Sequence, residues 1–118
     1  MLALDDKGQL QATIRDRGGQ SQSVTSAAFL PLREWRFIVM TADGDDLRIY
    51  VDGQLAASVP CAMMAVSGSE TVWFGTDAEG TGLWDGRIDE LAMFDKALAD
   101  NEIVSLHQTA LAQMARPR

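Results

Sequence analysis

The stretch WRFIVMTADGDDLRIYVDGQLAAS, residues Trp35 to Ser58, decides the fold of this chain. Its β-branched, aromatic and aliphatic residues fall into short runs separated by turn residues, a pattern typical of strands. The pair Asp52-Gly53 joins two of these runs, and Asp-Gly tolerates the positive φ angles that a tight type I′ hairpin requires. Residues Asp43 to Asp46 form a similar turn upstream. Glu34 to Val59 is therefore predicted to be a three-stranded meander.

The first strand of this meander has apolar side chains on both faces. A period of two puts one set of residues on one face (Trp35, Phe37, Val39 and Thr41) and a second set on the other (Arg36, Ile38 and Met40). Such a strand is expected at the centre of a sheet, with the opposing sheet on one side and a loop or helix partly covering the other.

Short β-type runs separated by turn residues continue on both sides of this meander. Their spacing of about ten residues is typical of a sandwich or barrel. The predicted strands, which lie within about residues 10–94, are Leu10 to Arg15, Ser23 to Phe29, Glu34 to Ala42, Leu47 to Asp52, Gln54 to Val59, Thr71 to Gly75 and Gly86 to Phe94.

The pattern changes to a helical one after Phe94. Apolar residues recur at steps of three and four (Ile103, Leu106, Ala110 and Met114). A helix is therefore predicted over about residues 100–114, beginning near Ala99 or Asp100, where acidic side chains favour the positive end of the helix dipole.

Length and composition allow one domain that spans residues 1–118. The chain has 118 residues, of which 47% are hydrophobic, and its formal net charge is -7. This charge argues against nucleic acid or anionic lipid as a partner. The sequence has no apolar run of 18 residues and no signal-peptide pattern, so we expect no membrane insertion. The one cysteine, Cys61, is expected to be a buried, inert thiol.

Two segments carry a family resemblance. They are Trp35 to Ser58 and WFGTDAEGTGLWDGRIDELAMFDKALADNEIVSLH, Trp73 to His107. In order and spacing they resemble the laminin-G-like group of the concanavalin A-like lectin and glucanase superfamily. The resemblance implies an all-β fold, an antiparallel β-sandwich of jelly-roll type with a short C-terminal α-helix.

Two departures from the family pattern lead to further expectations. Ala99 stands where the family usually has a capping Ser or Thr, so a looser helix start is expected. The family domain also has several strands before the counterpart of Leu2, so the chain resembles only the C-terminal two thirds of a sandwich. Such a sandwich exposes core and an unpaired edge. We therefore expect a homo-oligomer or a part of a larger chain or assembly.

The acidic and basic residues do not form a catalytic pattern. Glucanase relatives carry carboxylates two residues apart on one strand face, whereas Asp89 and Glu90 are adjacent and would point to opposite faces. His107 is expected to face solvent on the helix, without a Ser-His-Asp pattern. The glycines at 80, 82 and 86 lack a following Gly-Lys-Ser/Thr and are expected to be turn residues. The chain is therefore predicted not to be an enzyme.

Calcium is the one cofactor that the acidic loops suggest. Their carboxylates are oxygen donors, and the candidate ligands are Asp43, Asp45, Asp77 and Asp89, with Asp46 and Glu79 beside them. The alternative is that these loops are solvated acidic turns. Asp89 shares strand parity with Leu91 and Met93, so it is expected to be inward or semi-buried, in a structural or metal-binding role.

Exposed aromatic residues are the groups that a sugar-binding surface needs. Trp73 and Tyr50 are the candidate platforms, with Asp77 and Glu79 as neighbouring polar groups. For Trp35, Trp84 and Phe74 the family resemblance implies packing in the core. The resemblance implies a noncatalytic recognition module that binds glycan or protein at an extracellular, cell or virion surface. The alternatives are a structural or assembly domain completed by a partner strand, and an accessory domain of a larger secreted enzyme.

Overall fold

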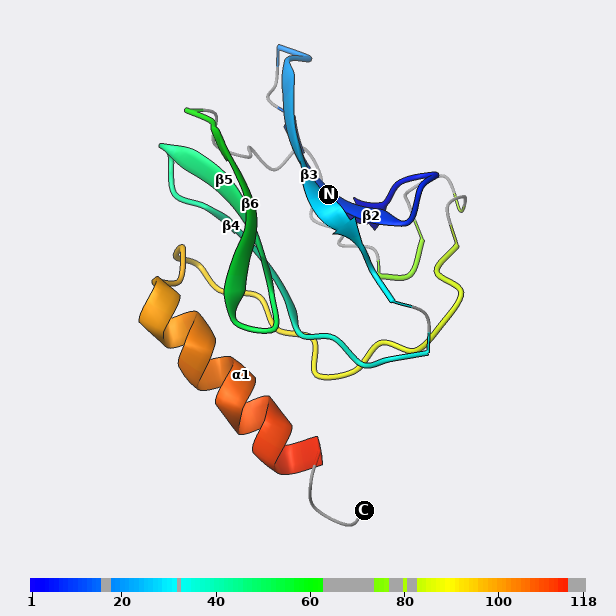
Figure 1. Ribbon diagram of the computed structural model, residues 1–118. Coiled ribbons are helices and arrows are strands. Elements are labelled where there is room, and N and C mark those ends of the chain that lie inside the picture. Colours follow the sequence, from blue (N-terminus) through cyan, green and yellow to red (C-terminus); the bar gives the residue numbers. More distant parts are fainter. Residues whose placement is uncertain (16–17, 32, 63–73, 77–79, 81–82, 115–118) are drawn as a thin grey trace.

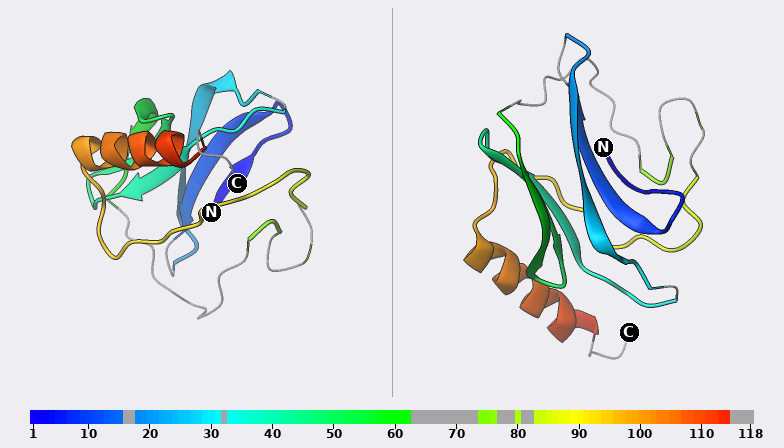
Figure 2. Two further views of the ribbon diagram at one scale, coloured as in Figure 1. Left: turned by 90° about the horizontal axis from the view of Figure 1, so that it is seen from below. Right: turned by 45° about the horizontal axis from the view of Figure 1, so that its top comes forward.

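The computed structural model describes residues 1–15, 18–31, 33–62, 74–76, 80 and 83–114. Within them six strands form two antiparallel three-stranded sheets, β1-β2-β3 and β4-β5-β6, and one helix, α1, follows. The sheets face each other as a partial β-sandwich, and α1 lies along the outer side of the second sheet (Figures 1 and 2). This confirms the predicted fold class. The elements are β1 (Leu2–Leu4), β2 (Gln9–Arg15), β3 (Ser21–Phe29), β4 (Ile38–Ala42), β5 (Asp46–Val51), β6 (Gln54–Pro60) and α1 (Asp100–Met114).

The core lies between the two sheets. Alternate residues of β2 and β5 point into it, because successive side chains of a strand leave on opposite faces. The buried members are Leu10, Ala12, Ile14, Val24, Leu47, Ile49 and Cys61. The burial predicted for Cys61 is confirmed, and β1 adds a short edge strand outside the predicted ones.

Both predicted turns of the meander are confirmed. Asp52 and Gly53 have φ angles of 53° and 81°, and Val51 pairs with Gln54, as a two-residue type I′ hairpin requires. In the upstream turn one carboxylate oxygen of Asp43 accepts the backbone N–H groups of Asp45 and Asp46, at 2.9 and 2.8 Å. The local chemistry of these turns therefore sets the register of three strands.

The position predicted for β4 is wrong, because β5 is the central strand of the second sheet. Two successive hairpins always place the middle strand between its neighbours. The two-sided covering is nevertheless present, since Ile38 and Met40 pack on the core while the Phe37 ring contacts α1. Trp35 precedes the strand and is 49% exposed, so its predicted core packing is also wrong.

No strand forms over Gly86–Phe94, which the structure describes completely. Glu90 interrupts the run with a φ of 59°, in the left-handed region, and its N–H donates to the Asp89 carboxylate at 2.8 Å. The run is therefore bent at its centre and does not join a ladder. Most of the strand predicted at Thr71 to Gly75 lies outside the described residues.

The predicted bounds of the helix match α1. Ala99 has no side chain that could cap the helix start, but the side chain of Glu102 stabilises it instead. Glu102 accepts the backbone N–H of Ala99 at 3.1 Å and pairs with Lys96 at 3.0 Å. The hydrogen bond from Ala99 lowers the pKa of Glu102, and the hydrogen bond from Lys96 lowers it further. This is one half of a capping box. The loose start expected from Ala99 is therefore wrong.

Candidate functional site

The outer face of the second sheet is a contact surface for α1. Tyr50 on β5 is 3% exposed, and its hydroxyl donates to Oδ1 of Asp100 at 2.6 Å. Burial, and then this hydrogen bond, raises the pKa of Tyr50 to about 12. A ring covered in this way cannot stack on a sugar. The ligand-platform role predicted for Tyr50 is therefore wrong, because the helix covers that face.

Asp52 connects three elements at the other end of this contact. Its carboxylate accepts the N–H of Phe37 at 3.0 Å, pairs with Arg36 at 2.8 Å, and lies 3.8 Å from Nε2 of His107. The His107 ring stacks on Phe37 with the ring centroids 5.5 Å apart. His107 therefore faces the sheet and not solvent, contrary to expectation.

The buried face of α1 is consequently rotated from the predicted one. Ile103 is fully buried and His107 and Ala110 are partly buried, whereas Leu106 and Met114 are exposed. The sequence pattern missed His107 because a histidine is not counted as apolar, although its ring packs like an aromatic residue here.

The acidic turn between β4 and β5 is locked by ion pairs. Arg48 bonds Asp43 at 2.9 Å and Asp46 at 2.7 Å. The backbone N–H groups of Asp46 and Asp45, with help from Arg48, lower the pKa of Asp43 to about 2. Asp45 accepts the N–H of Cys61 through its carbonyl oxygen at 2.8 Å. The turn thus has a structural use for the carboxylate of Asp43 that needs no cation.

The other predicted ligands do not gather around this turn. Among the residues that the structure describes, no three His, Cys, Asp or Glu side chains are placed to hold a metal ion together. Asp89 is exposed, as are Leu91 and Met93, so the semi-buried position predicted for it is wrong; the bend at Glu90 removes the strand on which that prediction rested. Trp73, Asp77 and Glu79 lie outside the described residues. The ligand platform at Trp73 and a calcium site that includes Asp77 and Glu79 therefore stay predictions.

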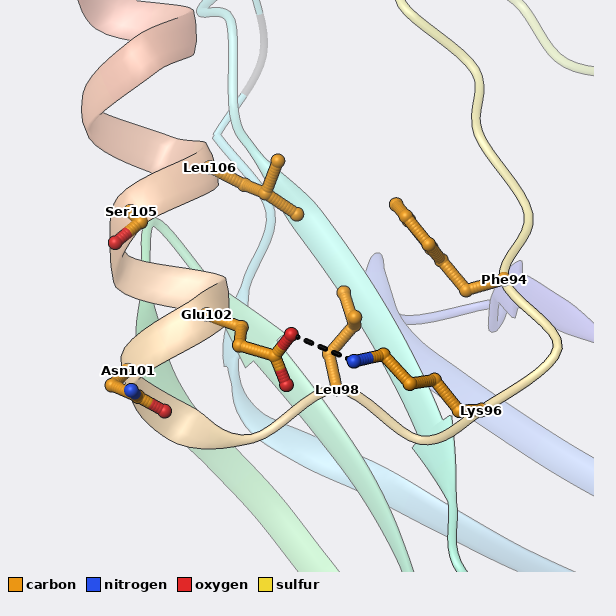
Figure 3. Close-up of a pocket in the computed structure, with 7 residues that line it drawn as sticks. All are labelled: Phe94, Lys96, Leu98, Asn101, Glu102, Ser105 and Leu106. Carbon is orange, nitrogen blue, oxygen red and sulfur yellow. Dashed lines mark hydrogen bonds and ion pairs between the residues drawn. The ribbon is translucent and has the colours of Figure 1, made fainter.

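An open groove of about 470 Å³ lies between the start of α1 and the segment before it, where sequence reasoning placed no site. Figure 3 shows Phe94, Leu98 and Leu106 around its apolar part and the Lys96–Glu102 ion pair crossing it. Asn101 and Ser105 add polar groups from the helix. The groove escaped prediction because Phe94 was expected to end a strand.

A second unpredicted feature is the run Leu83–Phe94, here named the apolar segment. Every residue in it is exposed, including six large hydrophobic ones: Leu83, Trp84, Ile88, Leu91, Met93 and Phe94. Phe74 nearby is exposed too, so the core packing predicted for Phe74 and Trp84 is wrong. The run joins neither of the two sheets, so no strand of the described part of the chain covers these side chains. In Figure 1 the run passes outside the strand ladders before it reaches α1.

No helix within the described part of the chain is long and apolar enough to cross a membrane.

Comparisons with known proteins agree with this architecture. Three solved chains match the fold. One is the 2.1 Å structure of an S-layer domain-containing protein (residues 221–444) from Clostridium thermocellum, with a TM-score of 0.59 and 20% identity. The match covers 85% of this chain and 52% of the other, so this chain spans about half the length of that structure. A search of curated proteins finds no match.

The family comparison covers most of the chain. The model of the Concanavalin A-like lectin/glucanases superfamily, in its laminin-G form, matches residues 1–104. This match includes both sheets and the first turn of α1. It confirms the resemblance carried by the meander and by the part of the second segment from Trp73 to Val104. The chain belongs to the concanavalin A-like lectin and glucanase superfamily.

Proposed function

We propose that this chain is a noncatalytic interaction domain that makes a protein–protein contact at a cell or particle surface. The observation that carries the proposal is the apolar segment. Six large hydrophobic side chains within twelve residues are exposed there. Exposed apolar surface of this extent is typical of protein interfaces. Assembly, the alternative weighed from the sequence, thus gains support over sugar recognition.

The surface location rests on the family and on the structural relative. Laminin-G-type domains are commonly displayed outside the cell, and the solved relative is described as S-layer domain-containing. The adjacent carboxylates of Asp89 and Glu90 both lie in the exposed, bent run, which is not the paired arrangement that sugar-bond cleavage uses. A binding role is therefore proposed in place of an enzymatic one.

Site-specific photocrosslinking in the producing cells tests this proposal. Benzoylphenylalanine in place of Phe94 puts the reactive group within the apolar segment, and the same replacement at Phe29 gives a matched control. Both phenylalanines are exposed, and Phe29 lies at the end of β3. We expect covalent protein adducts from position 94 and few from position 29. An absence of protein adducts from position 94 would refute the proposed contact.

The groove of Figure 3 supports a saccharide ligand as a second candidate. It offers an exposed aromatic ring, Phe94, beside the side chains of Asn101, Glu102 and Ser105. Sugars bind to such combinations, because the ring faces stack on the pyranose and the polar groups read the hydroxyls. A glycan array with wild type and Ser105→Trp, which fills the groove, tests it. Equal binding by both proteins would remove the groove as the site.

Calcium dependence belongs to the same assay. The array should be repeated with calcium and with EDTA, since the predicted ligands Asp77 and Glu79 remain candidates. Binding that survives EDTA would show that the saccharide candidate requires no metal.

A further inference from the structure

The chain between Leu83 and α1 is accessible to a protease. Residues 83–99 belong to no strand and no helix, and all of them are exposed except the half-buried Leu98. Figure 1 shows this run outside the strand ladders until it reaches α1. Exposed backbone of this kind is the preferred place for proteolytic cleavage, because a protease binds its substrate as an extended peptide.

Arg87 identifies the bond in this run that suits a serine protease of trypsin specificity. Such an enzyme binds an arginine or lysine side chain in its specificity pocket, so that side chain must be free to leave the domain. Arg87 is exposed, and no ion pair holds it within the described part of the chain. Ion pairs do hold Arg36, Arg48 and Lys96.

The bend at Glu90 does not oppose binding of the run in an extended form. Glu90 has a φ of 59°, which is unfavourable for a residue with a β-carbon. Extending the run breaks the hydrogen bond from the Glu90 N–H to Asp89, but it relieves this left-handed conformation. The bond between Arg87 and Ile88 can therefore reach the protease without disturbing either sheet.

Cleavage at this bond needs only water and the protease. The hydroxyl of water joins the carbonyl carbon of Arg87, and the C–N bond to Ile88 breaks. The nitrogen of Ile88 takes the proton and leaves as a free amine. The products are residues 1–87 and residues 88–118.

The hydrophobic core lies entirely on one side of this bond. Its buried members run from Leu10 to Cys61, and the partly buried residues packed against them run from Leu30 to Val59. All six strands also end before the bond, the last of them at Pro60. Residues 1–87 therefore keep both sheets, whereas α1 belongs to the other product.

The contact between α1 and the second sheet is small for two separate chains. Ile103 is the one buried residue in the 15 residues of the helix. The bond between Tyr50 and Asp100 and the stacking of His107 on Phe37 add to it. Stable interfaces between separate chains involve about 20 to 30 residues on each side. In the intact chain the covalent link keeps α1 at an effective concentration of about millimolar, which compensates for a weak contact.

We infer that the bond between Arg87 and Ile88 is a processing site for a serine protease of trypsin specificity, and that cleavage there releases α1 and uncovers the outer face of β5. This goes beyond the proposed function, because it concerns the free chain. A partner bound to the apolar segment would shield the bond. Cleavage of the free chain would remove most of that segment, including Leu91, Met93 and Phe94.

Limited trypsin digestion of the purified 118-residue chain, followed by mass spectrometry, tests the site. The first products should be residues 1–87 and 88–118. In Arg87→Gln the first cut should slow severalfold, and the product 88–118 should be absent. Arg33→Gln is the matched control and should be cut like wild type. Arg33 is exposed too, but the bonds from Arg36 and Phe37 to Asp52 restrain its run. A first cut at any other bond would overturn the site.

Size-exclusion chromatography of the digested chain at micromolar concentration tests the release. The two products should elute separately, and residues 1–87 should keep their strand signal in circular dichroism. Tyr50 is the one tyrosine, so its absorbance reports its cover directly. Its pKa, raised to about 12 in the intact chain, should return toward 10.0 in residues 1–87. Co-elution of the two products would overturn the release. Loss of the strand signal would do so too, because the core would then depend on α1.

Discussion

Replacing Asp52 with alanine tests whether one carboxylate joins β4, the β5–β6 hairpin and α1. Asp52 accepts the partly buried N–H of Phe37 at 3.0 Å and occupies the left-handed position of the hairpin, with a φ of 53°. Leaving a buried donor unpaired costs about 1 to 3 kcal/mol. The left-handed conformation costs about 1 kcal/mol more for alanine than for residues that tolerate it. The half-exposed pair with Arg36 adds little, because water and salt screen it.

The free energy of unfolding should therefore fall by about 2 to 4 kcal/mol in Asp52→Ala. Urea titration followed by tryptophan fluorescence measures it, with unchanged m-value as the condition for comparing midpoints. Asp52→Asn is the matched control, since the amide oxygen still accepts from Phe37 and asparagine tolerates positive φ. The control should lose less than half of what the alanine variant loses. Equal losses in the two variants would refute the reasoning, because the charge alone would then be responsible.

Three more predictions concern the contact between β5 and α1 and the two turns of the meander. Tyr50→Phe should lower the free energy of unfolding by about 1 to 2 kcal/mol through the lost bond to Asp100. In wild type stability should fall as the pH rises from 10 to about 12, since the folded pKa of Tyr50 is raised from 10.0; the phenylalanine variant should lack this fall. Because Tyr50 is the one tyrosine, tyrosinate absorbance reports it directly, and titration near pH 10 would contradict its burial. Asp43 has its pKa lowered from 3.8 to about 2, so its stabilising effect is present above pH 4 and is lost as the pH falls toward 2. In Asp43→Asn the free energy of unfolding, measured by urea titration at several pH values, should fall less than in wild type between pH 4 and 2. An equal fall in the two proteins would count against the hydrogen bonds described. Gly53→Ala should cost about 1 to 2 kcal/mol, because a β-carbon at φ 81° is strained and would lie 3.1 Å from Nδ1 of His107. A melting temperature equal to that of wild type would show that this hairpin relaxes freely.

Features set by neighbouring residues were predictable from the sequence. The Asp52-Gly53 hairpin, the turn at Asp43 and the bounds of α1 depend on local φ preferences, short hydrogen bonds and helical periodicity. Those are properties of a few adjacent side chains. The start of α1 is the exception, because Glu102 replaces the missing cap at Ala99 from three residues away.

Features set by distant partners were not predictable in the same way. The sequence predicts an exposed aromatic residue at Tyr50, but α1 covers it in the structure. It likewise predicts a surface residue at His107, whose ring stacks on Phe37. The strand predicted at Gly86 to Phe94 rests on the alternation of side chains between two faces, yet Glu90 takes a left-handed backbone conformation there. Parity describes which residues would share a face, but only a neighbouring strand can hold the run extended. The groove at Phe94 and the apolar segment both follow from that difference.

The bond between Tyr50 and Asp100 also bears on the order in which the chain folds. Its partners are 50 residues apart in sequence, whereas the contact between Phe37 and Asp52 spans 15. Closing a longer loop costs more chain entropy, and contacts of long range form more slowly. The meander from Ile38 to Pro60 should therefore assemble early, and α1 should dock late onto a sheet that already exists. Until then the outer face of β5, including Tyr50 near the end of the strand, is open to solvent in each newly made chain.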